Sequence, residues 1–165
     1  MKSKALTFCS ALVLISALPA DQKMPLDFTA EDGWEVEYKN EGAPFFVFSQ
    51  PKNEEVIFFF SRWPAPGGPD QIQRQLGKIA DGLLESAKQD EEIRFANPRY
   101  SIEDIDGQEF SGKAALFEME DGSLTAILMI SCGEGIWNGQ YHGPKDLYPE
   151  ARAILQSMKK ANKAE

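Results

Sequence analysis

Three short β-strands are predicted in the first part of the chain. Residues 34–38 alternate apolar and charged side chains, and this period of two is typical of a strand with one buried face. Residues 45–48 and 56–60 are apolar at every position, which indicates strands that are covered on both faces. Turn-forming residues at 40–42 and 51–53 separate these runs. We therefore expect the two apolar runs to lie inside a sheet.

A helix is predicted next, over residues 70–87. Asp70 is a favourable N-cap residue, and it follows a loop rich in proline and glycine. Apolar residues then recur every three or four positions and form one helical stripe: Ile72, Leu76, Ile79, Ala80, Leu83, Leu84 and Ala87. Gly77 and Gly82 each lower helix stability by about 1 kcal/mol relative to alanine. We expect these glycines to allow close packing of the helix against the sheet.

The second half of the chain predicts further strands and a closing helix. Strand patterns occur at 93–95, 100–105, 109–119, 124–130 and 136–141. Asp106 with Gly107, and Asp121 with Gly122, are signals for hairpin turns. Residues 144–161 then show a helical stripe, with Pro149 in the first turn and Lys159, Lys160 and Lys163 at the C-terminal end of the helix.

The order of these elements predicts an α+β fold. Glycine-containing turns between consecutive strands indicate antiparallel pairing, and two helices far apart in the sequence indicate cover on two faces. We therefore expect an antiparallel β-sheet with helices packed on its faces, which is an α/β/α sandwich.

The N-terminus resembles a signal peptide. Lys2 and Lys4 precede an uncharged, mostly apolar run at 5–18 that is too short to span a bilayer comfortably. We expect residues 1–20 to be a cleaved signal peptide and residues 21–165 to form a single exported domain, periplasmic or secreted, with no transmembrane segment after cleavage. An uncleaved anchor or a buried helix at 1–20 is the alternative interpretation.

Charge and cysteine content narrow the possible partners. The chain carries a formal net charge of −9, and cleavage would remove two lysines, so the mature surface is acidic. Because an acidic surface repels phosphate backbones, nucleic-acid binding is disfavoured.

The cysteine content excludes a disulfide within the mature domain. Cleavage would remove Cys9 and leave Cys132 alone, so that no intramolecular disulfide can form. We expect Cys132 to be a small buried side chain at a strand end, and a reactive or intermolecular thiol is the alternative.

Three segments resemble the PsbP-like and DcrB-like families. They are GWEVEYKN, the meander IEDIDGQEFSGKAALFEMEDGSLTAILMI and the closing WNGQYHGPKDLYPEARAILQSMKK, which ends a strand with Tyr141, His142 and Gly143 before a helix at 151–157. The resemblance covers about residues 32–160. It implies an α/β/α sandwich around an antiparallel sheet, and it implies a non-catalytic role as an accessory subunit, envelope protein or chaperone-like binder. It carries no shared catalytic motif, so no functional residue is transferred.

Motifs for catalysis or cofactor binding are missing from the sequence. His142 is the only histidine, no G-x-S-x-G elbow is present, and the pair Gly67–Gly68 is followed by proline rather than by the residues of a phosphate-binding loop. We therefore expect no catalytic residues, no cofactor and no metal site, and we expect the protein not to be an enzyme. A carboxylate-based hydrolase is the least favoured alternative. His142 is interpreted as an exposed residue at a strand end rather than as a ligand.

Aromatic residues supply the candidate binding surface. Trp63 lies beside Arg62 and next to the Pro-Gly loop, and loops often carry function. Trp137 and Tyr141 share a strand face with Gly139 between them, which predicts either a packing notch or a shallow pocket. The missing catalytic motifs, the signal peptide and the resemblance together predict an exported, non-catalytic domain that binds a protein partner or supports an envelope assembly, with these four residues as its candidate binding surface. The alternative is a carrier of a small apolar ligand or lipid in an aromatic-lined cavity.

Overall fold

The structure is a computed structural model, and it describes residues 26–30, 32–41, 43–50, 53–63, 69–90, 93–132 and 135–160. The expected signal peptide, and with it the boundary of the exported domain, lies outside the described residues. No helix of the described part is both long enough and apolar enough to cross a membrane.

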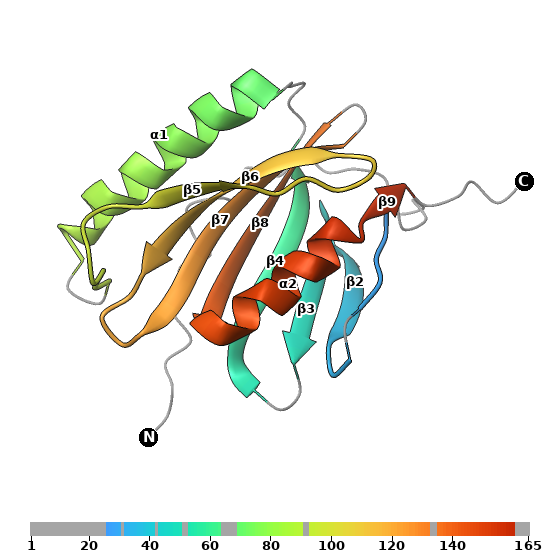
Figure 1. Cartoon of the computed structure of the whole chain (residues 1–165), viewed down its shortest axis with the longest axis horizontal. Helices are drawn as coiled ribbons and strands as arrows, with labels where there is room; N and C mark the ends of the chain where they lie inside the picture. The colour runs from blue at the N-terminus through green and yellow to red at the C-terminus, as the bar shows by residue number, and fades with distance from the viewer. Residues whose placement is uncertain are drawn as a thin grey trace, which may run out of the picture.

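Seven antiparallel strands form the main sheet, in the order β2-β3-β4-β8-β7-β6-β5 (Figure 1). The strands are β2 (Glu35–Glu41), β3 (Ala43–Gln50), β4 (Asn53–Trp63), β5 (Ser101–Asp104), β6 (Ser111–Glu118), β7 (Ser123–Cys132) and β8 (Gly135–Pro144). The two apolar runs predicted for the interior of the sheet lie in β3 and β4, each of which has a strand on both sides. The α+β fold expected from the sequence is confirmed.

Helices α1 (Pro69–Ala87) and α2 (Tyr148–Gln156) cover opposite faces of this sheet. In β7, Leu128 and Ile130 belong to the same buried cluster as Ile154 of α2. The intervening Met129 belongs instead to a second cluster, together with Leu76 of α1. Because neighbouring strand residues point to opposite faces, the two helices must lie on the two sides of the sheet. Figure 1 shows α2 crossing in front of the sheet, with α1 beside β5, β6 and β7.

In the first helix the predicted apolar stripe faces the sheet, but the two glycines are not closely packed against it as expected. Ile72, Leu76 and Ala80 are fully buried against the sheet. A methyl group added at Gly82 would meet no atom within 4 Å, and one added at Gly77 would lie 3.9 Å from the Tyr100 hydroxyl, an ordinary contact. The prediction that both glycines permit close packing is therefore wrong.

The closing helix is shorter than predicted. A 3₁₀ turn (Lys145–Leu147) precedes α2, and Pro149 lies in the first turn of α2 as expected. The helix ends at Gln156, and at its C-cap the Ser157 hydroxyl donates to the Ile154 carbonyl and accepts a hydrogen bond from the Thr29 amide at 2.8 Å. The chain then leaves the helix and forms a separate pair of short strands, β9 (Lys159–Lys160) with β1 (Leu26–Asp27). Lys159 and Lys160 are thus strand residues rather than helix-terminal ones, and Lys163 lies outside the described residues.

Two of the predicted turns and strands also differ from the structure. Residues 93–95 form a single bridge, between Phe95 and Met119, instead of a strand. The turn expected at Asp106 is a longer loop closed by a hydrogen bond from the Gly107 amide to the Phe110 carbonyl. The turn at Asp121 is confirmed: Gly122 has a φ of 83°, and the Asp121 carboxylate accepts hydrogen bonds from Ser123.

Polar side chains tie α2 to the edge of the sheet. The Tyr148 hydroxyl donates to the Glu103 carboxylate at 2.6 Å, and Arg152 donates to the other oxygen of Glu103 and to the Asp104 carbonyl. Burial raises the pKa of Tyr148, and the hydrogen bond to Glu103 adds to this effect. On the other side of α2, the Trp34 indole donates to Glu150 at 2.8 Å. These contacts fix the helix over β5 and the neighbouring strands.

We predict opposite effects for two glycine substitutions. In Gly112→Ala the new methyl would lie 2.7 Å from the Ile130 side chain and 2.8 Å from the Met129 carbonyl oxygen, so the variant should lose about 1–3 kcal/mol of stability. Gly82→Ala should gain about 1 kcal/mol, because the site is open and alanine favours the helix. Urea denaturation measures both. Equal effects of the two substitutions would contradict the described packing.

We predict that Tyr148→Phe lowers the free energy of unfolding by about 2 kcal/mol at neutral pH, because it removes a hydrogen bond to a charged carboxylate. Above about pH 10 the unfolded chain releases tyrosine protons that the folded protein retains, so the stability of the natural protein should fall as pH rises. The variant lacks one of these phenols, and its decline should be shallower. Denaturation between about pH 8 and pH 11 tests this, and parallel curves would contradict it.

Candidate functional site

Trp137 and Tyr141, proposed from the sequence as binding residues, lie in the core. Trp137 is 3% exposed and Tyr141 is fully buried. The Trp137 ring lies 6.1 Å from that of Phe46, and the Tyr141 ring packs edge-on against Tyr148 at 5.3 Å. The Tyr141 hydroxyl donates to the Pro144 carbonyl, and burial raises its pKa. Both side chains are taken up by the contact between the sheet and α2, so they do not present a binding surface.

The other two sequence-predicted residues lie at the end of β4. In the antiparallel register Arg62 pairs with Trp137 and Trp63 pairs with Ile136. They therefore belong to a paired strand rather than to a loop. Their side chains lie outside the described residues, so their role in binding stays a prediction.

His142 is half-buried and has a partner, in contrast to the exposed position expected. It lies directly opposite Thr125 of β7, and the imidazole Nδ1 shares a hydrogen bond of 2.9 Å with the Thr125 hydroxyl. Thr125 is only 6% exposed. Asp121 lies close by; its pKa is lowered chiefly by hydrogen bonds from Ser123 and to a smaller extent by the charge of His142. His142 thus provides a hydrogen-bond partner for the buried Thr125 hydroxyl.

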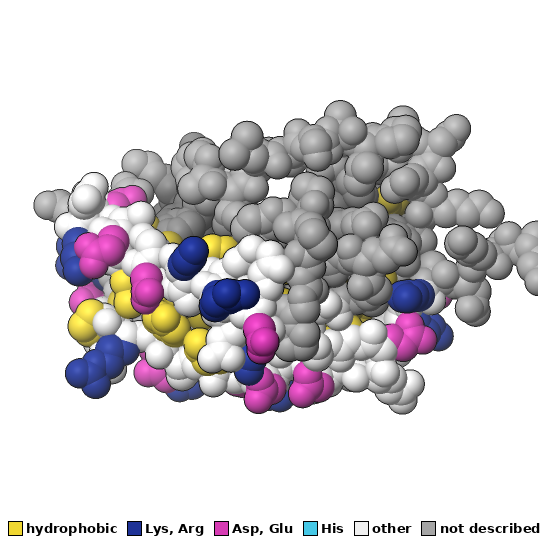
Figure 2. Space-filling model, turned by 90° about the horizontal axis from the view of Figure 1, so that it is seen from above, with side chains coloured by type: hydrophobic (Ala, Val, Ile, Leu, Met, Phe, Trp, Pro, Cys, Tyr) yellow, Lys and Arg dark blue, Asp and Glu magenta, His cyan; other side chains and the backbone are white. Residues whose placement is uncertain are grey.

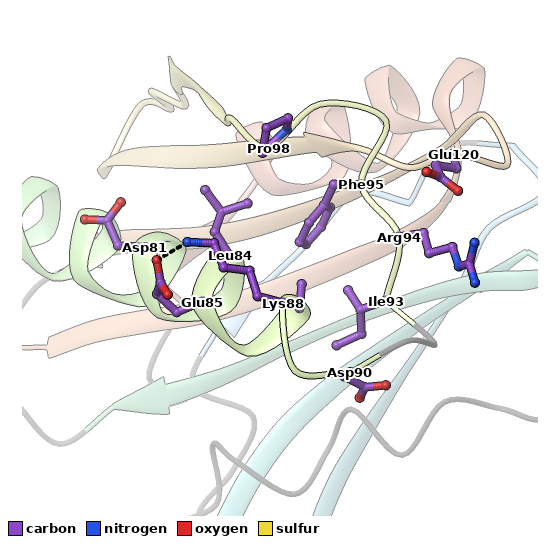
Figure 3. A pocket seen from close by; sticks show the side chains of 11 residues that line it. Asp81, Leu84, Glu85, Lys88, Asp90, Ile93, Arg94, Phe95, Pro98 and Glu120 are labelled. Carbon is purple, nitrogen blue, oxygen red and sulfur yellow. Dashed lines mark hydrogen bonds and ion pairs between the residues drawn. The ribbon is translucent and has the colours of Figure 1, made fainter.

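A surface groove of about 760 Å³ opens at the C-terminal end of α1 (Figure 3). We call it the α1 groove. Its walls are the last two turns of α1, the segment 93–98 and the turn around Glu120. Apolar groups come from Leu84, Ala87, Ile93, Phe95 and Pro98. Sequence reasoning missed this site, because the residues that form it come from a helix end and from a segment that was predicted to be a strand.

Backbone hydrogen bonds hold the segment 93–98 in place. The Ala96 amide donates to the Glu118 carbonyl at 2.9 Å, and the Glu120 amide donates to the Arg94 carbonyl at 3.0 Å. These bonds attach the segment to the hairpin of β6 and β7, next to α1. The segment therefore stands beside the helix as a wall of the groove.

The floor of the α1 groove is continuous with the core. Ile93 is 8% exposed, and the Phe95 ring packs against Phe117 of β6 at a centroid distance of 5.2 Å. Leu84 is half-buried and also contacts this core cluster. Because these apolar groups are held by the packing beneath them, a ligand would not have to order them on binding.

The rim of the groove is charged and mainly acidic. It carries four carboxylates (Asp81, Glu85, Asp90 and Glu120) and two cations (Lys88 and Arg94). Lys88 forms an exposed ion pair with Glu85 at 2.6 Å. The Tyr100 hydroxyl donates to Asp81, and burial is the main cause of the raised pKa of Tyr100. Seen from above, the described part of the surface shows charged groups of both signs around apolar patches (Figure 2).

The described residues contain no group of three or more His, Cys, Asp and Glu side chains that could hold a metal ion. Cys132, at the end of β7, has its main chain paired with Gly135. Its side chain lies outside the described part of the chain.

Comparison with known proteins assigns no family. No family model matches the chain, and no curated protein matches its sequence. A crystal structure from Bacteroides thetaiotaomicron VPI-5482 is similar at 18% identity and a TM-score of 0.48, over 85% of this chain and 46% of that chain. LpqN of Mycobacterium tuberculosis, described as involved in cell envelope biogenesis, is similar at 14% identity and a TM-score of 0.42, over 83% of each chain.

The chain thus spans less than half of the Bacteroides protein. The expected membership of the PsbP-like or DcrB-like families gains no support from the family models. The structure establishes the fold class rather than the family: it is an α+β fold with helices on an antiparallel sheet.

We predict that His142→Ala lowers the free energy of unfolding by about 1–3 kcal/mol, because it leaves the buried Thr125 hydroxyl without a partner. The double variant Thr125→Val with His142→Ala should recover part of this loss, since it removes both members of the hydrogen bond. Urea denaturation of the natural protein and of the two single variants and the double variant measures the coupling. A single variant as stable as the natural protein would contradict the assignment.

Proposed function

We propose that this protein is an exported, non-catalytic domain that binds a protein partner through the α1 groove. The observation that carries the proposal is the groove itself, with an apolar floor fixed by the core and a charged rim open to solvent. An apolar centre surrounded by a polar rim is the usual organisation of protein-binding sites. Export rests on the signal-like sequence of residues 1–20.

The composition of the groove favours binding over catalysis. Among the side chains that can act as nucleophiles, its described lining residues include no histidine, cysteine, serine or threonine, and Lys88 is held in an ion pair with Glu85. Its four carboxylates are exposed, whereas a carboxyl that acts as a general acid is usually surrounded by apolar groups. His142 does not line the groove and is engaged with Thr125.

Aromatic packing favours a protein partner over an enclosed apolar ligand. A carrier needs aromatic side chains that line an open cavity. Here the Phe28 ring lies 4.8 Å from Phe46 and 5.1 Å from Phe48, and Tyr38 lies 5.1 Å from Phe46. These rings are in contact with one another, so they fill the space that a ligand would need.

The groove can be tested by blocking it with a bulky residue. Ala87→Trp would place a large side chain in the groove, and Gln73→Trp, on an exposed position of the same helix outside the groove, is the matched control. We expect affinity capture from an envelope extract to recover the same partner with the natural protein and with Gln73→Trp, and to lose it with Ala87→Trp. Equal recovery by all three proteins, each confirmed as folded by circular dichroism, would contradict the proposed site.

A further inference from the structure

We propose that the α1 groove selects a cationic protein segment, one in which lysine or arginine side chains flank an apolar side chain. This inference rests on the proposed function and specifies the chemistry of its partner. The apolar side chain would contact Leu84 and Phe95 on the floor, and the cations would meet the carboxylates of the rim.

The charge balance of the rim is the first argument. Among the described lining residues four carboxylates face two cations, an excess of two negative charges. One of the cations, Lys88, is already paired with Glu85. Asp81 accepts its hydrogen bond from the neutral Tyr100 hydroxyl, so this contact leaves the negative charge in place. Glu120 has its carboxylate exposed at the opposite wall, as Figure 3 shows.

The orientation of α1 is a second, independent argument. The groove lies at the C-terminal end of this helix, where the peptide dipoles sum to a partial negative charge. Helices commonly place basic residues in the last turn to offset that charge, but the last turn of α1 has none, and Lys88, which directly follows the helix, is paired with Glu85. The helix end therefore adds to the negative potential of the rim, and a bound cation would offset both.

The exposed edge of β5 is a weaker candidate for the same segment. Ile102 there is 42% exposed, and the edge strand has only four residues. Its acidic side chains already have partners: Glu103 binds Arg152, and Asp104 binds Lys113. The chain also bends between Phe95 and Ser101, which interrupts the edge. The excess of negative charge and the apolar floor coincide at the groove rather than at this edge.

A pair of synthetic peptides tests the charge selection. The probe is a short, capped, fluorescently labelled peptide that alternates leucine with arginine, and its counterpart alternates leucine with glutamate. We expect fluorescence anisotropy to show binding of the arginine peptide only. Its Kd should rise about two- to fivefold for each removed carboxylate in Asp81→Asn and Glu120→Gln. Asp81→Asn keeps an acceptor for the Tyr100 hydroxyl, so it changes the charge with little change in shape.

The matched control is Glu35→Gln, which removes an exposed carboxylate from β2 on the opposite edge of the sheet. It should leave the Kd unchanged, and Ala87→Trp should abolish binding. Equal binding of the two peptides, or an effect of Glu35→Gln as large as that of Glu120→Gln, would overturn the charge selection.

Failure of this inference can be told apart from failure of the proposed function. If Ala87→Trp loses the captured partner but the arginine peptide does not bind, the groove remains a docking site and the cationic partner is wrong. If Ala87→Trp retains the captured partner, the proposed function itself is wrong.

Discussion

The whole structure depends on the burial of β6 and β7 from both sides. Neighbouring residues in these strands belong alternately to the cluster under α2 and to the cluster under α1. In β7 this alternation needs apolar side chains at consecutive positions, and residues 126–130 supply it with Ala, Ile, Leu, Met and Ile. A one-residue slip of the register would exchange the two faces, so the position of both helices follows from the pairing of these two strands.

The α1 groove is a consequence of how far the sheet supports the first helix. The apolar stripe of α1 runs along the whole helix, but its burial decreases from one end to the other. Ile72 and Leu76 are fully buried, whereas Leu84 and Ala87 near the C-terminus are only half-buried. The stripe is therefore longer than the surface that the strands offer it. Where the strands no longer cover the stripe, the segment 93–98 stands beside it and leaves a groove with an apolar floor.

Elements with a strong periodic pattern could be predicted from the sequence, whereas the site could not. The helix expected at 70–87 occurs at Pro69–Ala87, because its stripe matches the helical period over five turns. The pattern at 144–161 gave the position of α2 but not its end, since residues 159–160 pair with β1, which is distant in the sequence. The groove depends on a bridge between Phe95 and Met119 and on the place where α1 ends, and neither has a local signal.

The buried aromatic residues show why the sequence pattern could not tell core positions such as Trp137 and Tyr141 from a binding surface. Large rings at 46, 48, 137 and 141 all belong to the cluster between the sheet and α2, where their apolar area contributes most to stability. Among the described residues, Phe95 is the one aromatic side chain that lines the groove, and its ring is itself packed against Phe117. A site of this kind has little aromatic area for tight retention, and its exposed charges act mainly on the rate of association. A partner bound in the way we propose would therefore exchange rapidly, with a rate of association that falls as salt rises, rather than stay permanently assembled.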